Sequence, residues 1–191
     1  MARRTRAEME ETRASLLAVA RQVFTETGYA DASMDDLTAR AGLTRGALYH
    51  HFGDKQGLLA AVVAQIDAEM DERLKAISER ADTPWEGFRE RCRAYLRMAL
   101  EPEIQRIVLR DARAVLGGVP VAGEQQCIAS MRGLIEQSAI VGVDAEALAR
   151  MIHGSLTEAV FWIAAGENGD ERLEQASVTL DLLLGGLACG T

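Results

Sequence analysis

Apolar residues recur every three or four positions along most of the chain, which is the spacing of one face of an α-helix. Leu17, Ala20 and Phe24 follow this spacing, and Gly28 then supplies a helix stop. The pattern predicts a helix from about residue 7 to 27. Alternating Val, Ile and Thr, the sign of a β-strand, is missing, whereas the helix formers Ala, Leu, Arg and Glu dominate. We therefore predict an all-α fold.

The stretch 33–55 predicts two short helices joined by a tight turn. Ser33 stands where an N-cap belongs, and its hydroxyl is expected to accept a hydrogen bond from the amide of Asp36. Gly42 ends the first helix, because a tight corner needs the positive φ that glycine tolerates. Thr44 is expected to cap the second helix. This is the geometry of a helix-turn-helix, whose second helix enters the major groove of DNA.

The second helix of this pair separates inward apolar positions from outward polar ones. Leu43 in the turn and Leu48 in the helix are expected to be buried. Arg45 is the best candidate for reading a base, since its guanidinium can bond O6 and N7 of guanine together. Gly46 allows the helix to approach DNA closely. An ordinary helical corner with a solvated polar face is the alternative explanation.

The segment LYHHFGDKQGLL then resembles the signature of the TetR (tetracycline-repressor) family of bacterial regulators. The residues that stand at the spacing of that signature are Tyr49, His51, Phe52, Lys55 and Leu58. The close resemblance covers about the first third of the chain, and beyond it the helical character and the length agree. It implies a three-helix DNA-binding domain, residues 1–53, followed by a larger helical ligand-binding and dimerisation domain, residues 54–191.

The predicted DNA contacts combine these positions. Thr44, Tyr49 and His51 are placed to hold phosphate oxygens, and Lys55 joins a helix N-terminus that already favours anions. The resemblance implies that such positions contact the operator. His50 departs from the aromatic residue often found there in the family, so a base edge, a phosphate or simple exposure stays open for it. The full set is Ser33, Met34, Thr44, Arg45, Gly46, Tyr49, His50, His51 and Lys55.

Asp54 is expected to cap a long helix that runs to about residue 80. The resemblance implies that this helix links the ligand to the DNA mechanically, and a long core helix is the alternative. Thr83, Pro84 and Glu86 supply an N-cap, a proline at the first helical position and a capping box, so a new helix begins there.

The last two predicted helices are apolar on more than one side, which distinguishes them from the others. Asp144 and Asp170 are expected to cap them. One face must pack on the chain's own core, and a second copy is the economical partner for the other, giving a homodimer. A membrane surface is the weaker alternative, because neither segment has a basic face. The helices predicted after residue 100 span 103–116, as one short helix or two, and then 124–140, 144–166 and 170–188.

The net charge of −8 is unevenly distributed. Residues 1–60 hold eight basic and eight acidic side chains, so the excess of acid lies in the rest of the chain. A neutral module is not expected to bind DNA tightly through broad phosphate neutralisation. Specific contacts must therefore carry more of the affinity.

The three cysteines, Cys92, Cys127 and Cys189, are scattered and lack CxxC spacing, which disfavours a disulfide framework and a zinc site. A reduced cytoplasm fits them, and a thiol-based redox sensor, the remaining option, lacks a nearby activating base in the sequence. We identify no signal peptide and no apolar run of about 20 residues. A soluble cytoplasmic protein without a metal or cofactor is expected.

The sequence gives little support for an enzyme, since it lacks a glycine-rich phosphate loop, a nucleophile elbow and an HExxH motif. A ligand cavity is suggested by the family resemblance and by Met and aromatic residues within 85–162, although these could equally be plain core. His153 would be its polar anchor, and the ligand would be an unidentified, partly apolar small molecule. The candidate residues are Trp85, Phe88, Cys92, Tyr95, Met131, His153 and Trp162.

Together these patterns predict a homodimeric transcriptional repressor that a small molecule releases from a palindromic operator. Activation instead of repression stays open. The rival hypothesis is a helical binding or scaffold protein that no longer binds specific DNA, and the neutral N-terminal module is its best support.

Overall fold

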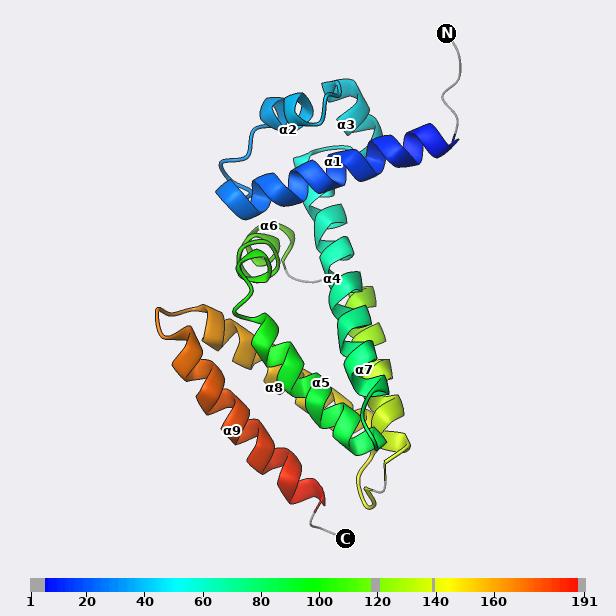
Figure 1. The fold of residues 1–191 in the computed structure, drawn as a ribbon, viewed down its shortest axis with the longest axis vertical. Helices are drawn as coiled ribbons and strands as arrows, with labels where there is room; N and C mark the ends of the chain where they lie inside the picture. Colours follow the sequence, from blue (N-terminus) through cyan, green and yellow to red (C-terminus); the bar gives the residue numbers. More distant parts are fainter. Residues whose placement is uncertain (1–5, 118–120, 139, 189–191) are drawn as a thin grey trace. The chain divides into compact units, whose positions relative to one another are not determined.

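The computed structural model describes residues 6–117, 121–138 and 140–188, and within these ranges it contains helices but no β-strand (Figure 1). The all-α prediction is therefore confirmed. The elements in chain order are α1 (Arg6–Thr27), α2 (Met34–Arg40), α3 (Arg45–Phe52), α4 (Lys55–Glu79), α5 (Pro84–Met98), the π-helix η1 (Ile104–Ala112), α6 (Arg113–Leu116), α7 (Val121–Glu136), α8 (Ala145–Ala164) and α9 (Gly169–Ala188).

Side-chain caps fix several helix starts that the sequence predicts. The side chains of Thr44, Thr83 and Asp144 each accept a hydrogen bond from the amide three residues further on, at 3.3, 3.2 and 2.7 Å. Asp54 does the same at the start of α4, where its Oδ1 accepts from the amide of Gly57 at 2.7 Å. These amides have no partner inside their own helices, so each cap stabilises its helix by about 1 kcal/mol.

Other predicted boundaries need correction. Ser33 accepts from the amide of Asp35 at 3.2 Å and not from that of Asp36. α9 begins at Gly169, which places Asp170 inside its first turn rather than at its cap. α7 begins and ends three to four residues earlier than predicted. Single turns at helix ends depend on local packing, which periodicity does not report.

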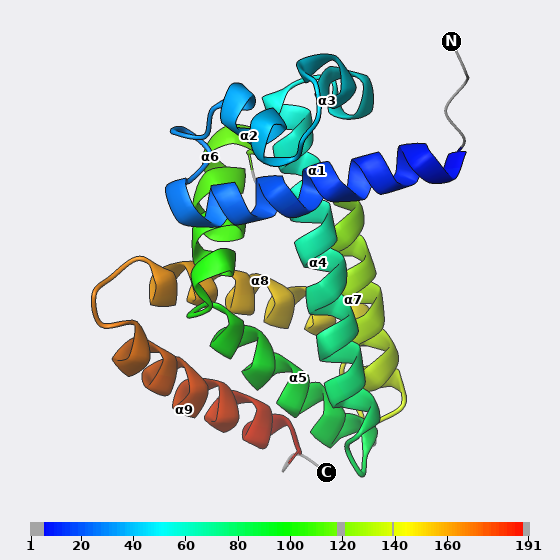
Figure 2. The same cartoon turned by 45° about the horizontal axis from the view of Figure 1, so that its top comes forward.

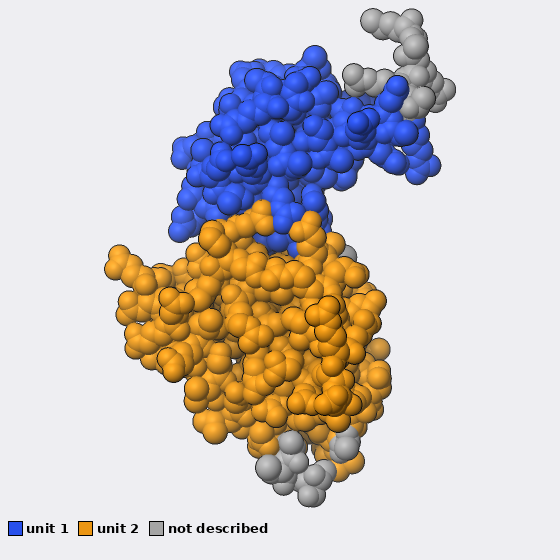
Figure 3. Space-filling model, viewed as in Figure 1, with its two compact units in different colours: residues 1–66, 106–119 blue, residues 67–105, 120–191 orange. Residues whose placement is uncertain are grey.

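The chain divides into two compact units, each of which contains two separate stretches of sequence (Figure 3). Unit 1 comprises residues 1–66 and 106–119, and unit 2 comprises residues 67–105 and 120–191. The boundary therefore differs from the one expected at residue 53. The first turns of α4 contribute to unit 1, and a second stretch, which begins at residue 106, returns to it.

Unit 1 is built on α1, which contacts α2, while α2 contacts α3 (Figure 2). Leu37 of α2, Leu48 of α3 and Leu58 of α4 are at most 1% exposed, and each contributes about 1.5–3 kcal/mol through its burial. The buried residues of α1 follow the predicted stripe and are Leu16, Leu17, Ala20, Val23 and Phe24.

The returning stretch, residues 106–117, is tied to the end of α1 by polar contacts. The guanidinium of Arg106 donates to the carbonyl of Thr27 at 2.5 Å, and the Asp111 carboxylate accepts from the amide of Tyr29 at 2.7 Å. Gly28 has a φ of +81°, and a Cβ there would lie 2.3 Å from the Arg106 guanidinium. The stop predicted at Gly28 therefore also makes room for a side chain from a distant part of the sequence.

Unit 2 is organised around α5, which contacts α7, α8 and α9 (Figure 1). Phe88 and Cys92 of α5 are at most 1% exposed, and so are Ile163 of α8 and Leu184 of α9. Helices with one apolar stripe each must bury it against another element, and here α5 supplies the shared face. In the described ranges, no helix combines the length and the apolar character that crossing a membrane requires.

Candidate nucleic-acid interface and ligand cavity

The short helix α3 presents a polar face that its own packing holds in place. Leu48 is fully buried, whereas Arg45, Tyr49 and His50 are exposed, with 49% of the Tyr49 surface accessible. Leu43 is half-buried rather than the buried plug that the sequence suggested. One side of α3 is thus anchored in unit 1, and the other points three polar side chains outward.

Gly46 lies in the first turn of this outward face. A Cβ added to it would meet only Thr44 Oγ1, at 3.8 Å. Packing within unit 1 therefore does not demand a glycine here. The missing side chain instead leaves the backbone of α3 open to a close approach from outside.

Arg45 is held by a carboxylate of the preceding helix. Its Nε lies 2.5 Å from Asp35 Oδ1, and its Nη2 donates to Asp35 Oδ2 at 2.6 Å. Two parallel bonds of this kind fix the plane of the guanidinium as well as its position. Both side chains are more than half exposed, so the pair is open to solvent.

The other predicted contact residues lie around α3 and at the start of α4. Lys55 Nζ donates to the carbonyl of Ala30 at 3.3 Å and lies 4.5 Å from the centroid of the Tyr29 ring. Burial lowers the pKa of Lys55, and Asp31 and Asp111 oppose that shift. The His51 ring is half-buried. Ser33 is exposed at the cap of α2, and Met34, which follows it, is half-buried.

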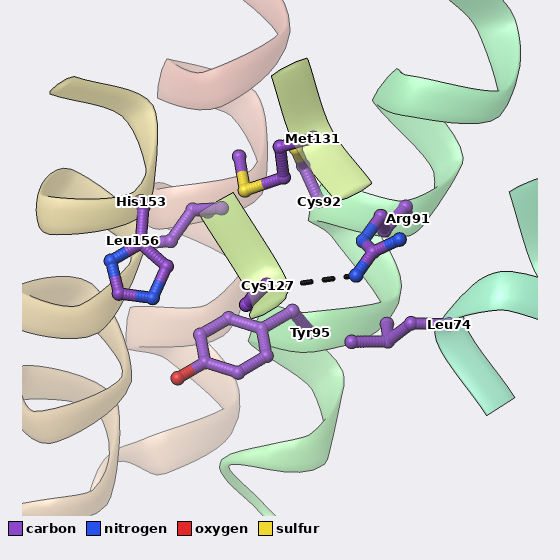
Figure 4. A pocket seen from close by; sticks show the side chains of 8 residues that line it. All are labelled: Leu74, Arg91, Cys92, Tyr95, Cys127, Met131, His153 and Leu156. Atoms are coloured by element: carbon purple, nitrogen blue, oxygen red, sulfur yellow. Dashed lines mark hydrogen bonds between the residues drawn. The ribbon is translucent and has the colours of Figure 1, made fainter. Parts of the chain in front are cut away.

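A small cavity of about 10 Å³ lies within unit 2 (Figure 4). That volume holds about one water molecule. Helices α4, α5, α7 and α8 contribute to its wall. The residues that line it are Leu74, Arg91, Cys92, Tyr95, Cys127, Met131, His153 and Leu156.

Arg91 supplies the positive charge in this wall, and its side chain is only 3% exposed. Its Nη1 donates to Ser130 Oγ at 2.6 Å, and its Nη2 donates to Asp71 Oδ1 at 3.1 Å. A longer contact of 3.9 Å joins Nη2 to Cys127 Sγ, drawn as the dashed line in Figure 4. A buried guanidinium is costly unless it is paired in this way.

The remaining polar groups of the cavity are neutral at pH 7. Burial lowers the pKa of His153, which leaves the imidazole uncharged. Burial also raises the pKa of Tyr95 to about 12. The charges of Cys127 and Asp67 raise this pKa further, and a hydrogen bond with Thr157 lowers it. The wall therefore offers neutral hydrogen-bonding groups beside one guanidinium.

The thiols of the cavity are poor nucleophiles. Burial raises the pKa of Cys92 to about 12, and it also raises the pKa of Cys127 despite the opposing charge of Arg91. Because the thiolate is the reactive form, these values disfavour a thiol-based redox sensor. Cys189 lies outside the described residues.

The N-terminal helices and the helices after residue 84 match two family models. One, described as bacterial regulatory proteins of the tetR family, matches residues 16–62. The other, described as the tetracyclin repressor-like C-terminal domain, matches residues 85–187, which is more than half of the chain.

The chain belongs to the TetR family of bacterial regulatory proteins.

Known proteins support this membership over both units. A TetR-family transcriptional regulator from Pectobacterium atrosepticum, solved by crystallography, is 69% identical, with a TM-score of 0.90 over 96% of this chain and 97% of that one. The regulator SrpR of Pseudomonas putida is 48% identical over 64 residues, or 34% of this chain and 30% of that protein. The first curated relatives are matched over less than half of their length.

A more distant structure shares the fold alone. FadR of Bacillus subtilis, solved in complex with stearoyl-CoA, has a TM-score of 0.72 at 16% identity, covering 91% of this chain and 98% of that one.

With the family established, the chain is a TetR-family transcriptional regulator, and the prediction that it is not an enzyme is confirmed.

Four of the seven residues predicted for a ligand site in this TetR-family protein line the cavity: Cys92, Tyr95, Met131 and His153. The other three lie elsewhere. The Trp85 ring stacks on Phe88, with centroids 5.3 Å apart, and Trp162 is 42% exposed, with the Arg172 guanidinium 5.3 Å from its centroid.

Four lining residues were not predicted from the sequence, namely Leu74, Arg91, Cys127 and Leu156. A signal for Arg91 was present. It follows Phe88 by three positions and precedes Tyr95 by four, so it falls on the apolar stripe of α5, where a charged residue needs an explanation. No comparable signal marked Leu74, because it simply continues the buried stripe of α4 after Ile66 and Met70.

Asp67 of α4 allows a pH-dependent test of the polar groups near Tyr95. Burial raises the pKa of this carboxyl group from 3.8 to about 6. The folded state therefore binds an extra proton between these values, so the free energy of unfolding falls as the pH rises through that window. Asp67→Asn is expected to stabilise the regulator at pH 8 by about 1–2 kcal/mol, allowing for partial exposure.

Urea unfolding at pH 8 and pH 4.5 checks this expectation. The gain should shrink at the lower pH, where the wild-type carboxyl group is itself mostly protonated. Glu72→Gln, on the exposed side of the same helix, is the control and should lack this pH dependence. An equal effect of Asp67→Asn at both pH values would show that the carboxyl group is not destabilised by burial.

Proposed function

We propose that this TetR-family regulator is a homodimeric repressor that binds a palindromic operator through α3 and releases it when a small molecule binds in unit 2. The observation that carries the proposal is the exposed face of α3, with Arg45, Tyr49 and His50 outward and Leu48 buried. A helix-turn-helix needs this division, because the recognition helix must be rigid and its base-reading side must be open.

Exposed apolar side chains on α8 and α9 support the dimer. Met151 is 71% exposed and Leu182 is 73% exposed, and Val178 and Leu183 are each more than half exposed. Large apolar side chains in such numbers on two neighbouring helices indicate a protein interface. Two copies related by a twofold axis would read two half-sites, so the operator is proposed to be a palindrome.

The cavity of unit 2 supports a ligand that combines an apolar body with an acceptor or anionic group. Leu74, Met131 and Leu156 supply apolar surface, while Arg91 supplies the charge. At about 10 Å³ the cavity holds no ligand as it stands, so binding has to move its walls. Since the FadR structure contains stearoyl-CoA, the fold accommodates ligands far larger than this space.

α4 is the proposed link between the ligand and the DNA. It carries Leu58 and Leu59 in the core of unit 1, and Leu74 of the same helix lines the cavity. A ligand that binds more tightly when the wall has moved would shift the equilibrium toward that state of the helix. Successive half-sites of the operator require the two α3 helices of the dimer to lie about 34–36 Å apart. The movement of α4 would change that spacing, and the dimer would no longer fit the operator.

A helical binding protein without specific DNA contacts is the second candidate function. It is favoured by the neutral charge of residues 1–60 and by the pairing of Arg45 with Asp35. Selection of bound fragments from a genomic DNA pool, followed by sequencing, separates the two. An enriched palindrome supports the repressor, whereas random fragments support the binding protein.

Arg45→Ala is expected to weaken operator binding by about 1–3 kcal/mol and to relax the preference at one base pair of each half-site. The reason is the loss of a guanidinium that can bond guanine at two atoms. Mobility shifts with the selected operator and its single-base variants measure both effects.

Arg40→Ala is the matched control for this prediction. Arg40 also carries one positive charge at the surface of unit 1 and is likewise paired with carboxylates, those of Glu26 and Asp36, but it lies on α2 and not on α3. If removing Arg40 relaxes the same base preference as removing Arg45, then charge rather than base contact explains the result, and Arg45 is not the reader.

A further inference from the structure

Asp35 of α2 grips one particular edge of the Arg45 guanidinium. The bonds run from Nε to Oδ1 and from Nη2 to Oδ2, so the carboxylate occupies the side of the fork. The adjacent end of the guanidinium, formed by Nη1 and the second hydrogen of Nη2, is not used by Asp35. That end carries parallel N–H groups of the kind that bond O6 and N7 of guanine.

A guanidinium held in this way is restrained in its plane before it meets DNA. A free arginine side chain costs about 2 kcal/mol of rotamer entropy to fix, and a plane set in advance avoids part of that cost. It also misfits other bases, because a rigid fork cannot turn to find other acceptors. Pairing with Asp35 therefore favours selectivity.

The same pair changes the charge that α3 presents to DNA. Arg45 alone would attract any phosphate, whereas the Arg45–Asp35 pair is neutral overall. Non-specific binding depends on how many phosphates are neutralised, so the carboxylate weakens it for every sequence. Asp35 thus combines a fixed donor edge with a low affinity for random DNA, in residues 1–60, whose eight basic and eight acidic side chains cancel in total.

We propose that Asp35 is a positioning residue for base recognition: it clamps the Nε–Nη2 edge of Arg45, so that the remaining edge is presented to a guanine of the operator. This inference rests on the proposed function, since it requires that Arg45 reads a base. Asp35 itself is not a base-contacting residue in this role.

The test compares Asp35→Asn with the wild-type protein, using the operator selected by the wild type and its variants at the guanine positions. An asparagine keeps the shape but offers one acceptor oxygen and a competing amide donor. We expect the ratio of affinities for guanine over other bases to fall about fivefold or more, with tighter binding to random DNA.

Asp36→Asn is the matched control. It removes the same charge from the same turn of α2, but Asp36 pairs with Arg40 through a 2.9 Å bond to Nε rather than with Arg45. Its guanine preference should stay at the wild-type value. Thermal unfolding and circular dichroism of each variant establish that α2 is still folded, because both acids also favour the helix N-terminus.

A double-variant cycle separates positioning from other effects. If Asp35 acts through Arg45, then Asp35→Asn changes no base preference in an Arg45→Ala protein. If Asp35 instead only competes with DNA for the Arg45 guanidinium, Asp35→Asn should bind the operator more tightly, and its guanine preference should be unchanged or raised. That result overturns the inference.

The failure of the inference and the failure of the proposed function give different results. A wild-type protein that enriches no palindrome overturns both. A wild-type protein that enriches a palindrome, and whose guanine preference survives Asp35→Asn, overturns the positioning role of Asp35 alone. The repressor hypothesis then stands, with Arg45 reading its base unaided.

Discussion

Replacing Arg91 with alanine is expected to lower the free energy of unfolding by about 3 kcal/mol. The guanidinium bonds Ser130 and Asp71, and its side chain is 3% exposed. Its loss leaves the hydroxyl and the carboxylate without their partner. Asp71 retains 37% exposure, so water recovers part of its stabilisation, and the estimate lies at the low end for a broken buried pair.

The space left by Arg91 adds to that effect. The wall already encloses a cavity of about 10 Å³, and removing a long side chain enlarges it, with a cost that grows with the volume that cannot collapse. Urea unfolding followed by circular dichroism measures the change in midpoint. Arg97→Ala, at an exposed position on the same helix, is the control and should stay within about 0.5 kcal/mol of wild type.

Equal effects of Arg91→Ala and Arg97→Ala would contradict the buried pairing. The opposite outcome has a functional consequence. If the cavity is the ligand site, a destabilised Arg91→Ala protein should still enrich the same palindrome, since Arg91 belongs to unit 2 and the proposed DNA contacts belong to unit 1. Its response to an anionic ligand should be lost.

Gly57→Ala is expected to destabilise the protein by about 2–3 kcal/mol, although alanine is the better helix former. A Cβ on Gly57 would lie 2.0 Å from the carbonyl oxygen of Phe52 and 3.2 Å from its carbonyl carbon. Both are backbone atoms at the end of α3, where the amide of Gly53 donates to Tyr49. They cannot swing aside as a flexible side chain would, so α3 and α4 have to move apart.

Such a movement should also reduce operator binding, because α3 carries the proposed contacts. Thermal unfolding and mobility shifts of the same sample test both parts. Gly133→Ala is the matched control, since a Cβ at that position meets nothing within 4 Å. This substitution should stabilise α7 by roughly 0.5–1 kcal/mol, because alanine is the better helix former. A Gly57→Ala protein as stable as wild type would show that the contact between α3 and α4 is looser than described.

The residues that line the cavity could be predicted only in part from the apolar periodicity of single helices. Periodicity on α5 placed Cys92 and Tyr95 on one face, and both line the cavity. The same periodicity predicted that Phe88 lines the cavity, yet Phe88 stacks on Trp85 instead. Residues at equivalent positions of one helix can meet different neighbours, and the neighbours come from α4, α7 and α8, whose placement a single helix does not encode.

The recognition helix shows the reverse case. The cap by Thr44, the positive φ of Gly42 at +63° and the outward side of Arg45 all follow from local chemistry, and the structure agrees with each. The ion pair between Arg45 and Asp35 did not follow, because it joins two helices across the turn. Its geometry depends on their angle, and it converts a free arginine into a held one.

By itself the sequence determined the helical class, most helix starts and the helix-turn-helix with its outward polar face, because caps, glycine stops and apolar stripes act within one or two helical turns. Only the tertiary structure decided which parts fold as a unit. The return of residues 106–117 to the end of α1 and the burial of Arg91 each involve atoms that meet only after the chain has folded back on itself.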